Sequence, residues 1–448
     1  MSKPSLPTQL PKERAFLIGV DLAGNQSQLS MEDSLIELAL LADTAGLSVV
    51  GQATQKLKHP DPKTFLRSGK VQEVRHLVEE TLADIVLFDD ELSPRHQREL
   101  EKIFGDDVRI LDRSALILDI FAQHASTREG ALQVELAQYE YLLPRLTRAW
   151  THLARQAGGG GGRAGSVGGV GLRGPGETQL EVDRRVIGAR ISKLKSELEK
   201  VRQHRSQYRS RRRKAEIPTI ALVGYTNAGK STLINKLSGS DVYVADQLFA
   251  TLDPTTRRIE LPGGHSVLIT DTVGFIQKLP ATLVAAFRAT LEEIAEADLL
   301  LHVVDISHPN ALSHAVVVRD TLEEIHAREL PVVTAMNKID LLSDGDIPAG
   351  LLDEFDRAVP ISARTGEGIP ILLSVAEEEL YERFEALTVR LPYQEGKLIS
   401  MFHEQGVIEK IEHMDSSVLI KGRVPMHLAP EYDAFSQDVP SSDQSFES

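Results

Sequence analysis

The 448-residue chain contains no cysteine, a single tryptophan and only 5% aromatic residues. The absence of cysteine excludes disulfide bonds and thiolate metal sites, and we therefore expect a reducing, cytoplasmic environment. No apolar run approaches the roughly 18 residues that a membrane span needs, and the polar N-terminus has no apolar signal core. A hydrophobic content of 42% is that of an ordinary globular protein, and the length predicts roughly two to four domains.

Charge is strongly segregated along the chain. Residues 184–214 hold 13 Lys and Arg residues against two acids, a net charge of +11, whereas the whole chain carries −15. A basic segment in an acidic protein predicts a polyanion-binding surface, with nucleic acid as the partner. The alternative is a charged helix that is merely solvated, because charge runs alone are weak indicators.

Residues 14–125 alternate apolar, strand-like runs with amphipathic helical patterns. The predicted strands are residues 15–20, 47–50, 84–88 and 108–111, and the predicted helices are residues 31–44, 71–81, 94–104 and 115–121. This alternation predicts a small parallel α/β domain. Gly69 and Lys70 open a helix without the full phosphate-loop spacing, so a plain loop–helix junction is the favoured interpretation.

Residues 126–215 predict a helical hairpin. Two apolar seams of coiled-coil spacing run along it: Leu132, Leu136, Tyr139, Leu143, Leu146, Trp150 and Leu153, then Leu180, Ile187, Ile191, Leu194, Leu198, Val201 and Tyr208. The simplest packing is antiparallel, with each seam burying the other.

Between the seams lies a glycine-rich tip, residues 157–177. It includes 11 glycines within residues 158–176, too many to hold a defined structure alone. One interpretation is a flexible linker. The other is a functional tip that threads into a narrow nucleic-acid cavity, because long loops in compact units are commonly functional. The sequence leaves both open.

Residues 216–384 contain the most specific motif of the chain. It follows an apolar run and precedes a helical pattern, and its residues are Gly224, Tyr225, Thr226, Asn227, Ala228, Gly229, Lys230 and Ser231. This is the phosphate-loop pattern G-x-x-x-x-G-K-[ST] in its strand–loop–helix context, where backbone N–H groups and the helix N-terminus cradle phosphates. Lys230 is predicted to reach the β and γ phosphates, and Ser231 to ligate Mg²⁺.

Three further motifs follow predicted strands in the order that a GTPase requires. They are Asp271, Thr272, Val273 and Gly274; then Asn337, Lys338, Ile339 and Asp340; then Ser362, Ala363 and Arg364. We expect Asp271 to reach Mg²⁺ through water and the Gly274 N–H to meet the γ-phosphate. Asp340 can accept two hydrogen bonds from guanine that adenine cannot supply, so the site should reject ATP.

The segment between the first two motifs should hold the threonine that completes the Mg²⁺ shell in the triphosphate state. Thr251 is the preferred candidate and Thr255 the alternative. The neighbours of Thr251 in the predicted nucleotide site are Phe249, Ala250, Leu252 and Asp253. Lys230, Thr251 and Gly274 are the predicted catalytic residues.

These motifs, together with Gly174-Pro175-Gly176-Glu177-Thr178-Gln179-Leu180-Glu181 and Asp183-Arg184-Arg185, resemble the HflX family of ribosome-associated, translation-factor-like GTPases. The resemblance covers most of the chain. It implies a GTPase that binds the large (50S) ribosomal subunit and splits stalled 70S ribosomes under stress. It also implies that the glycine-rich tip reaches toward the peptidyl-transferase region.

Phe275 stands where Ras-like GTPases place the glutamine that orients the attacking water. Phenylalanine cannot make that hydrogen bond, so we expect slow intrinsic hydrolysis that ribosomes accelerate. Asn227 resembles the asparagine with which related GTPases hold K⁺ beside the phosphates, although an Asn that favours the turn carries equal weight.

Residues 385–428 predict a small α+β domain, and residues 429–448 an acidic, disordered tail. We expect a monomer. Two other functions stay open: a GTPase in ribosome assembly or RNA modification, and an RNA-binding scaffold in which GTP is structural and little is hydrolysed.

Overall fold

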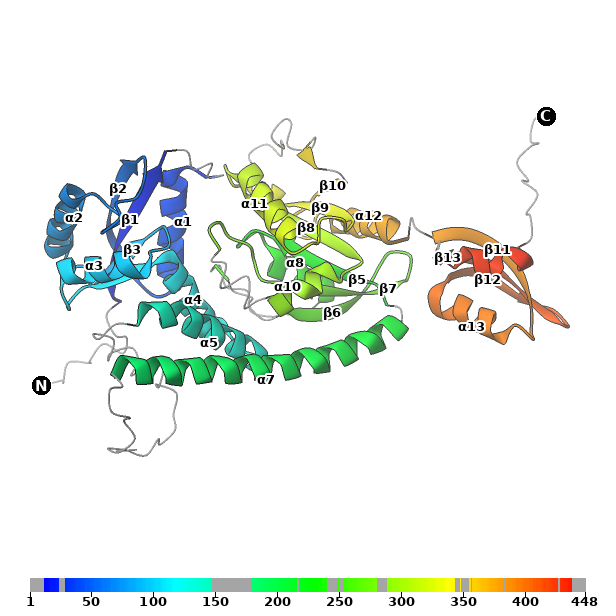
Figure 1. Ribbon diagram of the computed structural model, residues 1–448. Helices are drawn as coiled ribbons and strands as arrows, with labels where there is room; N and C mark the ends of the chain where they lie inside the picture. The colour runs from blue at the N-terminus through cyan, green and yellow to red at the C-terminus, as the bar shows by residue number, and fades with distance from the viewer. Residues whose placement is uncertain are drawn as a thin grey trace, which may run out of the picture.

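The computed structural model describes residues 12–23, 29–146, 179–215, 217–239, 248–249, 254–279, 288–342, 347, 354–355, 357–381, 384–425 and 428–436. An N-terminal sheet, a central sheet and a C-terminal sheet follow one another along the molecule, and a long helix runs beside the first two (Figure 1). None of the helices in these ranges is long and apolar enough to cross a membrane.

The N-terminal unit is a parallel sheet with helices on both faces, in the strand order β2-β1-β3-β4. Its elements are β1 (Arg14–Leu22), α1 (Met31–Thr44), β2 (Ser48–Leu57), α2 (Ser68–Thr81), β3 (Ile85–Phe88), α3 (Pro94–Phe104), β4 (Arg109–Asp112) and α4 (Arg113–His124). Successive side chains of a strand point to opposite faces. Ala15 and Leu17 therefore pack with α1 and α4, whereas Phe16 and Ile18 pack with α2 and α3.

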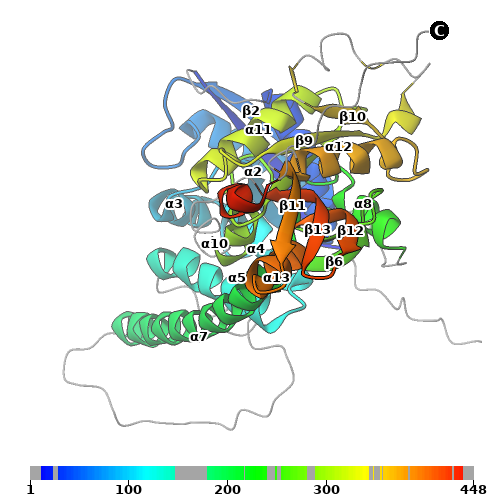
Figure 2. The ribbon, with the colours of Figure 1, turned by 90° about the vertical axis from the view of Figure 1, so that its right-hand side faces the viewer.

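Helices α5 (Arg128–Leu142) and α7 (Gln179–Ala215) lie side by side in both ribbon views (Figures 1 and 2). Leu132, Leu136 and Leu194 are buried in one cluster between them. The predicted pairing of the two helical segments is confirmed over this part of the seams.

The first seam does not continue as one helix to Leu153, as its spacing predicts. Helix α5 ends at Leu142, and the single turn η1 (Leu143–Arg145) follows. Pro144 accounts for the difference, because proline has no N–H and its ring clashes with the preceding helical turn. Trp150, Leu153 and the glycine-rich tip lie outside the described residues.

The central unit is a six-stranded sheet in the order β10-β9-β8-β5-β7-β6, parallel except for β6. Its elements are β5 (Thr219–Gly224), α8 (Lys230–Ser238), β6 (Thr255–Glu260), β7 (Ser266–Asp271), α10 (Arg288–Ala295), β8 (Leu299–Asp305), α11 (Ala311–Glu324), β9 (Val332–Asn337), η2 (Ile339–Leu341), β10 (Ala358–Pro360) and α12 (Ile369–Tyr381). The carboxyl ends of parallel strands meet at one edge of a sheet. The four motifs follow β5, β7, β9 and β10, so the fold brings them to the same edge.

The C-terminal unit is an antiparallel sheet in the order β11-β13-β12. Its elements are β11 (Phe384–Pro392), α13 (Gly396–Gln405), β12 (Val407–His413), β13 (Ser417–Pro425), α14 (Ala429–Tyr432) and η5 (Asp433–Phe435). The expectation that disorder begins at residue 429 is wrong. Tyr432 is fully buried, and its hydroxyl donates to the Leu398 carbonyl at 3.0 Å. Burial of the Tyr432 ring holds this segment in the folded unit, although its acidic composition predicted a disordered tail.

Candidate GTP-binding site

The phosphate loop joins β5 to α8 and needs glycine at two positions. Gly224 has φ 154° and Gly229 has φ 99°. A Cβ at Gly224 would lie 2.3 Å from the Val303 carbonyl oxygen, and one at Gly229 would lie 2.2 Å from Nδ2 of Asn337. Only glycine fits both positions. Because α8 begins at Lys230, the free N–H groups of its first turn belong to this loop.

Lys230 is buried within the loop that it serves. Its Nζ donates to the carbonyl oxygens of Gly224 at 3.0 Å and Tyr225 at 2.8 Å. Burial lowers the pKa of Lys230 to about 8, although Asp271 acts in the opposite direction. A buried cation among backbone N–H groups fits the phosphates of a nucleotide.

Ser231 and Asp271 provide oxygen atoms suited to Mg²⁺. Ser231 Oγ donates to Asp271 Oδ2 at 2.8 Å, so the two predicted metal-binding residues are neighbours. No cluster of three or more His, Cys, Asp or Glu residues that could hold a metal occurs in the described part of the chain. Mg²⁺ at a nucleotide site commonly takes only one or two protein ligands besides phosphates and waters, so this pair is sufficient.

The third predicted metal ligand, Thr251, lies outside the described residues, as do Ala250, Leu252 and Asp253. The alternative, Thr255, begins β6 and stands opposite Asp271 in the β6–β7 register.

Asn337 connects three of the motifs. Its Nδ2 donates to the Ala228 carbonyl in the phosphate loop at 2.8 Å, and its Oδ1 accepts from the Ala363 N–H at 2.9 Å. Lys338 has φ 71° and forms a 2.7 Å ion pair with Asp305. The Asn337 side chain therefore links its own loop to the phosphate loop at Ala228 and to the last motif at Ala363, two segments that are 135 positions apart in the sequence.

Asp340 is held by the last motif. Ser362 Oγ donates to Asp340 Oδ1 at 2.6 Å, and Arg364 Nη2 lies 2.9 Å from Oδ2. The Arg364 side chain is 73% exposed, so this ion pair is weak. The buried Ser362 fixes the orientation of the carboxylate that we expect to read guanine, and Ile339 lies beside it in η2.

The segment from Asp271 onward is joined to the phosphate loop by backbone hydrogen bonds. The Thr226 N–H donates to the Phe275 carbonyl at 2.8 Å, and the Phe275 N–H donates to the Gly224 carbonyl at 3.1 Å. Thr272 and Val273, which lie between Asp271 and Gly274 in the sequence, are buried. The Phe275 ring is 1% exposed and packs in the apolar core, so it offers nothing to orient a water molecule.

Tyr225 joins the phosphate loop to the N-terminal unit. Its hydroxyl donates to the Glu37 carboxylate of α1 and accepts from the Gln277 N–H at 3.0 Å. Burial raises the pKa of Tyr225, so the phenol keeps its proton. The ring stacks on His314 with centroids 3.9 Å apart, and burial lowers the pKa of His314 to about 4, which keeps that ring neutral.

Arg113, the first residue of α4, lies at the centre of the same contact. The side chain is 1% exposed. Its Nη2 donates to Glu37 at 2.7 Å, its Nη1 to the Gln277 carbonyl at 3.3 Å, and its Nε lies 3.5 Å from Asp89. Lys278 adds ion pairs to Asp89 and, at 2.7 Å, to Asp90. The N-terminal unit thus contacts the segment just after Gly274.

Phe249 also contacts the N-terminal unit. Its ring packs edge-on against Phe121 of α4, with centroids 4.6 Å apart, and is 3% exposed. The structure therefore places this predicted nucleotide-site side chain in the core between the units. One signal of the contact between the units is visible in the sequence. Glu37 is a charged residue between Leu35 and Leu38 on the buried, mostly apolar face of α1.

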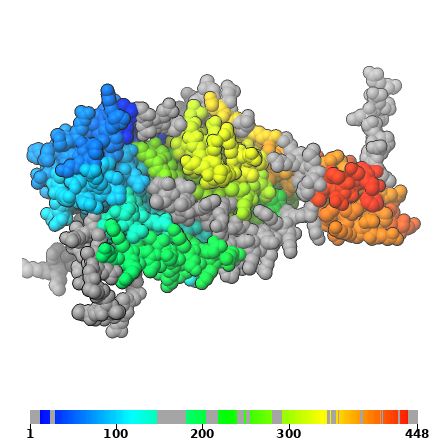
Figure 3. Space-filling view, viewed as in Figure 1, coloured from blue at the N-terminus to red at the C-terminus, as the bar shows by residue number. Residues whose placement is uncertain are grey.

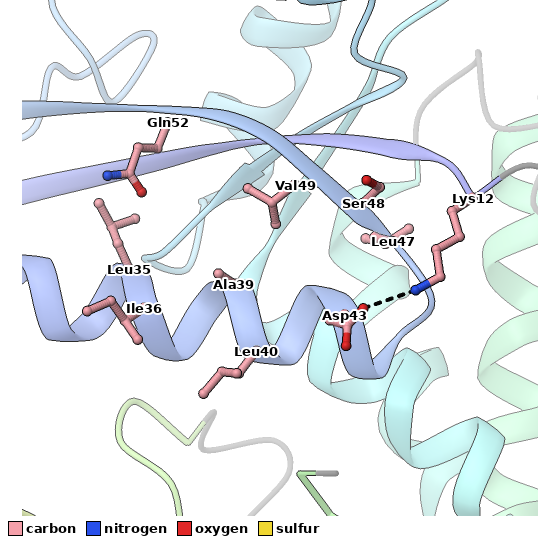
Figure 4. A pocket seen from close by; sticks show the side chains of 10 residues that line it. All are labelled: Lys12, Leu35, Ile36, Ala39, Leu40, Asp43, Leu47, Ser48, Val49 and Gln52. Atoms are coloured by element: carbon pink, nitrogen blue, oxygen red, sulfur yellow. Dashed lines mark hydrogen bonds and ion pairs between the residues drawn. The ribbon is translucent and has the colours of Figure 1, made fainter. Parts of the chain in front are cut away.

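A separate hollow of about 490 Å³ lies between α1 and β2 (Figure 4). Leu35, Ile36, Ala39 and Leu40 form its apolar wall, and a 3.0 Å ion pair between Lys12 and Asp43 stands at one end. None of the GTPase motifs lines it.

Three family models match consecutive parts of the chain. They are described as the GTP-binding GTPase N-terminal region (residues 32–122), the GTP-binding GTPase middle region (124–212) and a 50S ribosome-binding GTPase (219–338). A crystal structure described as an SsGBP–GDP complex overlaps with a TM-score of 0.46 and 24% identity, over 83% of this chain and 99% of that one.

Curated relatives match over nearly the full length. The GTPase HflX of Escherichia coli K12 is 48% identical over 418 residues, which span 92% of this chain and 94% of that protein. The GTPase HflX of Chlamydia pneumoniae is 44% identical, over 90% of this chain and 84% of that protein. With the phosphate loop, the Asp271 segment and the Asn337–Asp340 loop assembled at one sheet edge, this similarity shows that the chain belongs to the HflX family of GTPases.

Proposed function

We propose that this GTPase binds the large (50S) ribosomal subunit as a monomer and, with GTP, dissociates stalled 70S ribosomes under stress. The contact is made by the basic helix α7 and by the glycine-rich tip that precedes it. Helix α7 is the observation that carries the proposal. The match of residues 219–338 to a family described as a 50S ribosome-binding GTPase also supports it.

Helix α7 is long and basic, and many of its described side chains are exposed. Its 37 residues span about 55 Å at the usual rise per residue, and it forms one edge of the molecule in the space-filling view (Figure 3). Arg190 and Lys195 are paired with Glu135 and Glu140 of α5. Other basic side chains, including Arg184, Lys193 and Lys200, are exposed. Such a face suits the phosphate backbone of ribosomal RNA.

Charge reversal on this face tests the contact. The variant Arg184→Glu with Lys200→Glu should weaken binding to purified 50S subunits and reduce the slope of log K against log salt by about 2, one unit for each lost phosphate contact. Arg95→Glu with Arg98→Glu, at two exposed positions of α3, reverses the same number of charges and controls for net charge. Equal weakening by both variants would show that binding is not localised to α7.

Sucrose-gradient sedimentation tests the splitting of ribosomes. Stalled 70S ribosomes should separate into subunits with GTP or a non-hydrolysable analogue and stay associated with GDP. Intact 70S particles under all three conditions would contradict the proposal. Binding without splitting would instead favour a role in ribosome assembly or an RNA-binding scaffold.

Hydrolysis should be slow without ribosomes, because the buried Phe275 side chain cannot position water. We expect purified 50S subunits to raise the rate of phosphate release at least about tenfold. This is less than the rate increase that a partner's arginine finger can supply to a GTPase. An unchanged rate would contradict this.

We also propose that a monovalent cation, K⁺, binds beside Asn227. Asn227 is exposed and has φ 58°, a conformation that asparagine tolerates in turns. If K⁺ binds here, replacing K⁺ with Na⁺ should slow turnover in the wild type and have no effect on Asn227→Gly, which keeps the backbone conformation. Equal rates in both salts would assign Asn227 to the turn alone.

A further inference from the structure

Thr226 has a buried hydroxyl group that no described residue satisfies. The residue is 7% exposed, and its Oγ1 has no hydrogen-bond partner in the part of the chain that the structure describes. Its backbone is fixed, because the N–H donates to the Phe275 carbonyl at 2.8 Å. Buried hydroxyls without partners are costly and uncommon, so this one calls for an explanation.

The position of Thr226 is defined by Gly274 and Lys230. A Cβ placed on Gly274 would lie 2.9 Å from Thr226 Cα, 3.0 Å from Thr226 Cγ2 and 3.0 Å from Lys230 Nζ. The Thr226 side chain and the Lys230 ammonium group therefore border the same point on Gly274. Lys230 and Gly274 are the residues that we expect to contact the γ-phosphate, so Thr226 lies at the γ-phosphate end of the loop.

The neighbouring side chains of the loop are directed elsewhere or cannot donate. The Tyr225 hydroxyl is committed to Glu37, Asn227 is exposed, and Ala228 has no polar group. Phe275, which replaces the usual glutamine, is apolar. Among residues 225–228, the Thr226 hydroxyl is consequently the buried neutral donor that remains uncommitted, and its side chain borders Gly274.

We propose that the Thr226 hydroxyl donates a hydrogen bond to a γ-phosphate oxygen of GTP and thereby distinguishes GTP from GDP. A phosphate oxygen satisfies the buried hydroxyl, and a hydrogen bond to a charged acceptor is stronger than one between neutral groups. GDP has no γ-phosphate, so it cannot make this contact. The inference concerns nucleotide discrimination and holds whether or not the protein acts on ribosomes.

Three variants of the full chain test this contact. Thr226→Val keeps the shape and removes the hydroxyl, Thr226→Ala removes it with less bulk, and Thr226→Ser keeps it. The measurement is the dissociation constant for fluorescent GDP and for a fluorescent non-hydrolysable GTP analogue, in Mg²⁺ and without ribosomes. We expect the Val and Ala variants to lose about 10- to 100-fold in affinity for the GTP analogue, the range for hydrogen bonds to charged groups, with GDP affinity nearly unchanged.

The serine variant should bind both nucleotides like the wild type. Wild-type affinity for the GTP analogue in either hydroxyl-free variant would overturn the assignment. So would an equal loss for GDP, which would indicate a distorted loop, or a loss in the serine variant as large as in the valine variant, which would assign the effect to the methyl group. Single-turnover hydrolysis should be slower in the valine and alanine variants than in the wild type and unchanged in the serine variant.

Discussion

Replacing Arg113 with methionine is expected to loosen the N-terminal unit from the segment that follows Gly274. The guanidinium group is buried and serves both units at once, since it pairs with Glu37 and Asp89 and donates to the Gln277 carbonyl. Methionine fills much of the same volume without the charge. The substitution therefore removes the electrostatic contact and leaves two buried carboxylates behind.

The two carboxylates are affected unequally. Asp89 keeps its ion pair with Lys278 and its hydrogen bond from Ser34 at 2.6 Å. Within the part of the chain that the structure describes, Glu37 keeps only the hydrogen bond from the Tyr225 hydroxyl. Breaking a buried ion pair by removing one partner costs about 3–5 kcal/mol, a large part of the roughly 5–15 kcal/mol that stabilises a folded domain. Glu37 carries most of that cost.

Hydrogen exchange of the amides in residues 272–279 measures this loss locally. The Gln277 N–H, which donates to the Tyr225 hydroxyl, reports the opening directly. A loss of about 3 kcal/mol should raise the exchange rate of amides limited by this opening roughly 150-fold. Nucleotide is left out of the buffer, so that its binding does not mask the change.

Two further variants make the result interpretable. Arg98→Met, at an exposed site on α3, should exchange like the wild type. Adding Glu37→Gln to Arg113→Met removes the unpaired charge, so the double variant should be protected better than Arg113→Met alone. Unchanged exchange in Arg113→Met, or additive losses in the double variant, would refute this account of the contact.

Three other outcomes can be measured independently. Because burial lowers the Lys230 pKa to about 8 and bound phosphate favours the ammonium form, GDP affinity should be constant below pH 8 and fall up to about tenfold per pH unit above it; a flat calorimetric profile would contradict this. Asp340→Asn should weaken GTP binding by about 100-fold or more, because one of the two carboxylate acceptors becomes an NH₂ donor that faces a guanine N–H group, and competition with xanthine nucleotides should then succeed. Tyr432→Ala should destabilise the C-terminal unit by about 3–5 kcal/mol, seen as earlier proteolysis after residue 384.

The contacts between the N-terminal unit and the GTPase motifs could not be predicted from sequence patterns. Glu37 meets Tyr225 across 188 positions of sequence, and Arg113 meets Gln277 across 164. No periodicity or local motif relates residues so far apart. A buried charge is tolerated only where folding supplies its partner, and the identity of that partner is a property of the folded chain.

The units themselves were predictable to different degrees. Alternating apolar runs fixed the parallel sheet of residues 14–125, because each strand and helix is a local pattern. The apolar seam failed beyond Leu142, where one proline outweighed a regular spacing. The tail expectation failed at Tyr432, where a single buried ring outweighed an acidic composition.

The sequence by itself determined which residue types stand at the site: a phosphate loop ending in Lys230 and Ser231, the Asp340 that we expect to read guanine, and a phenylalanine where Ras-like GTPases have a water-orienting glutamine. Those assignments depend on residue type and spacing within a few positions, which a linear sequence displays. Only the tertiary structure decided that Phe249 packs on Phe121, that Tyr225 binds Glu37, and that the Thr226 hydroxyl is buried without a hydrogen-bond partner among the described residues. These depend on which surfaces of distant segments meet, and burial is what makes each contact energetically important.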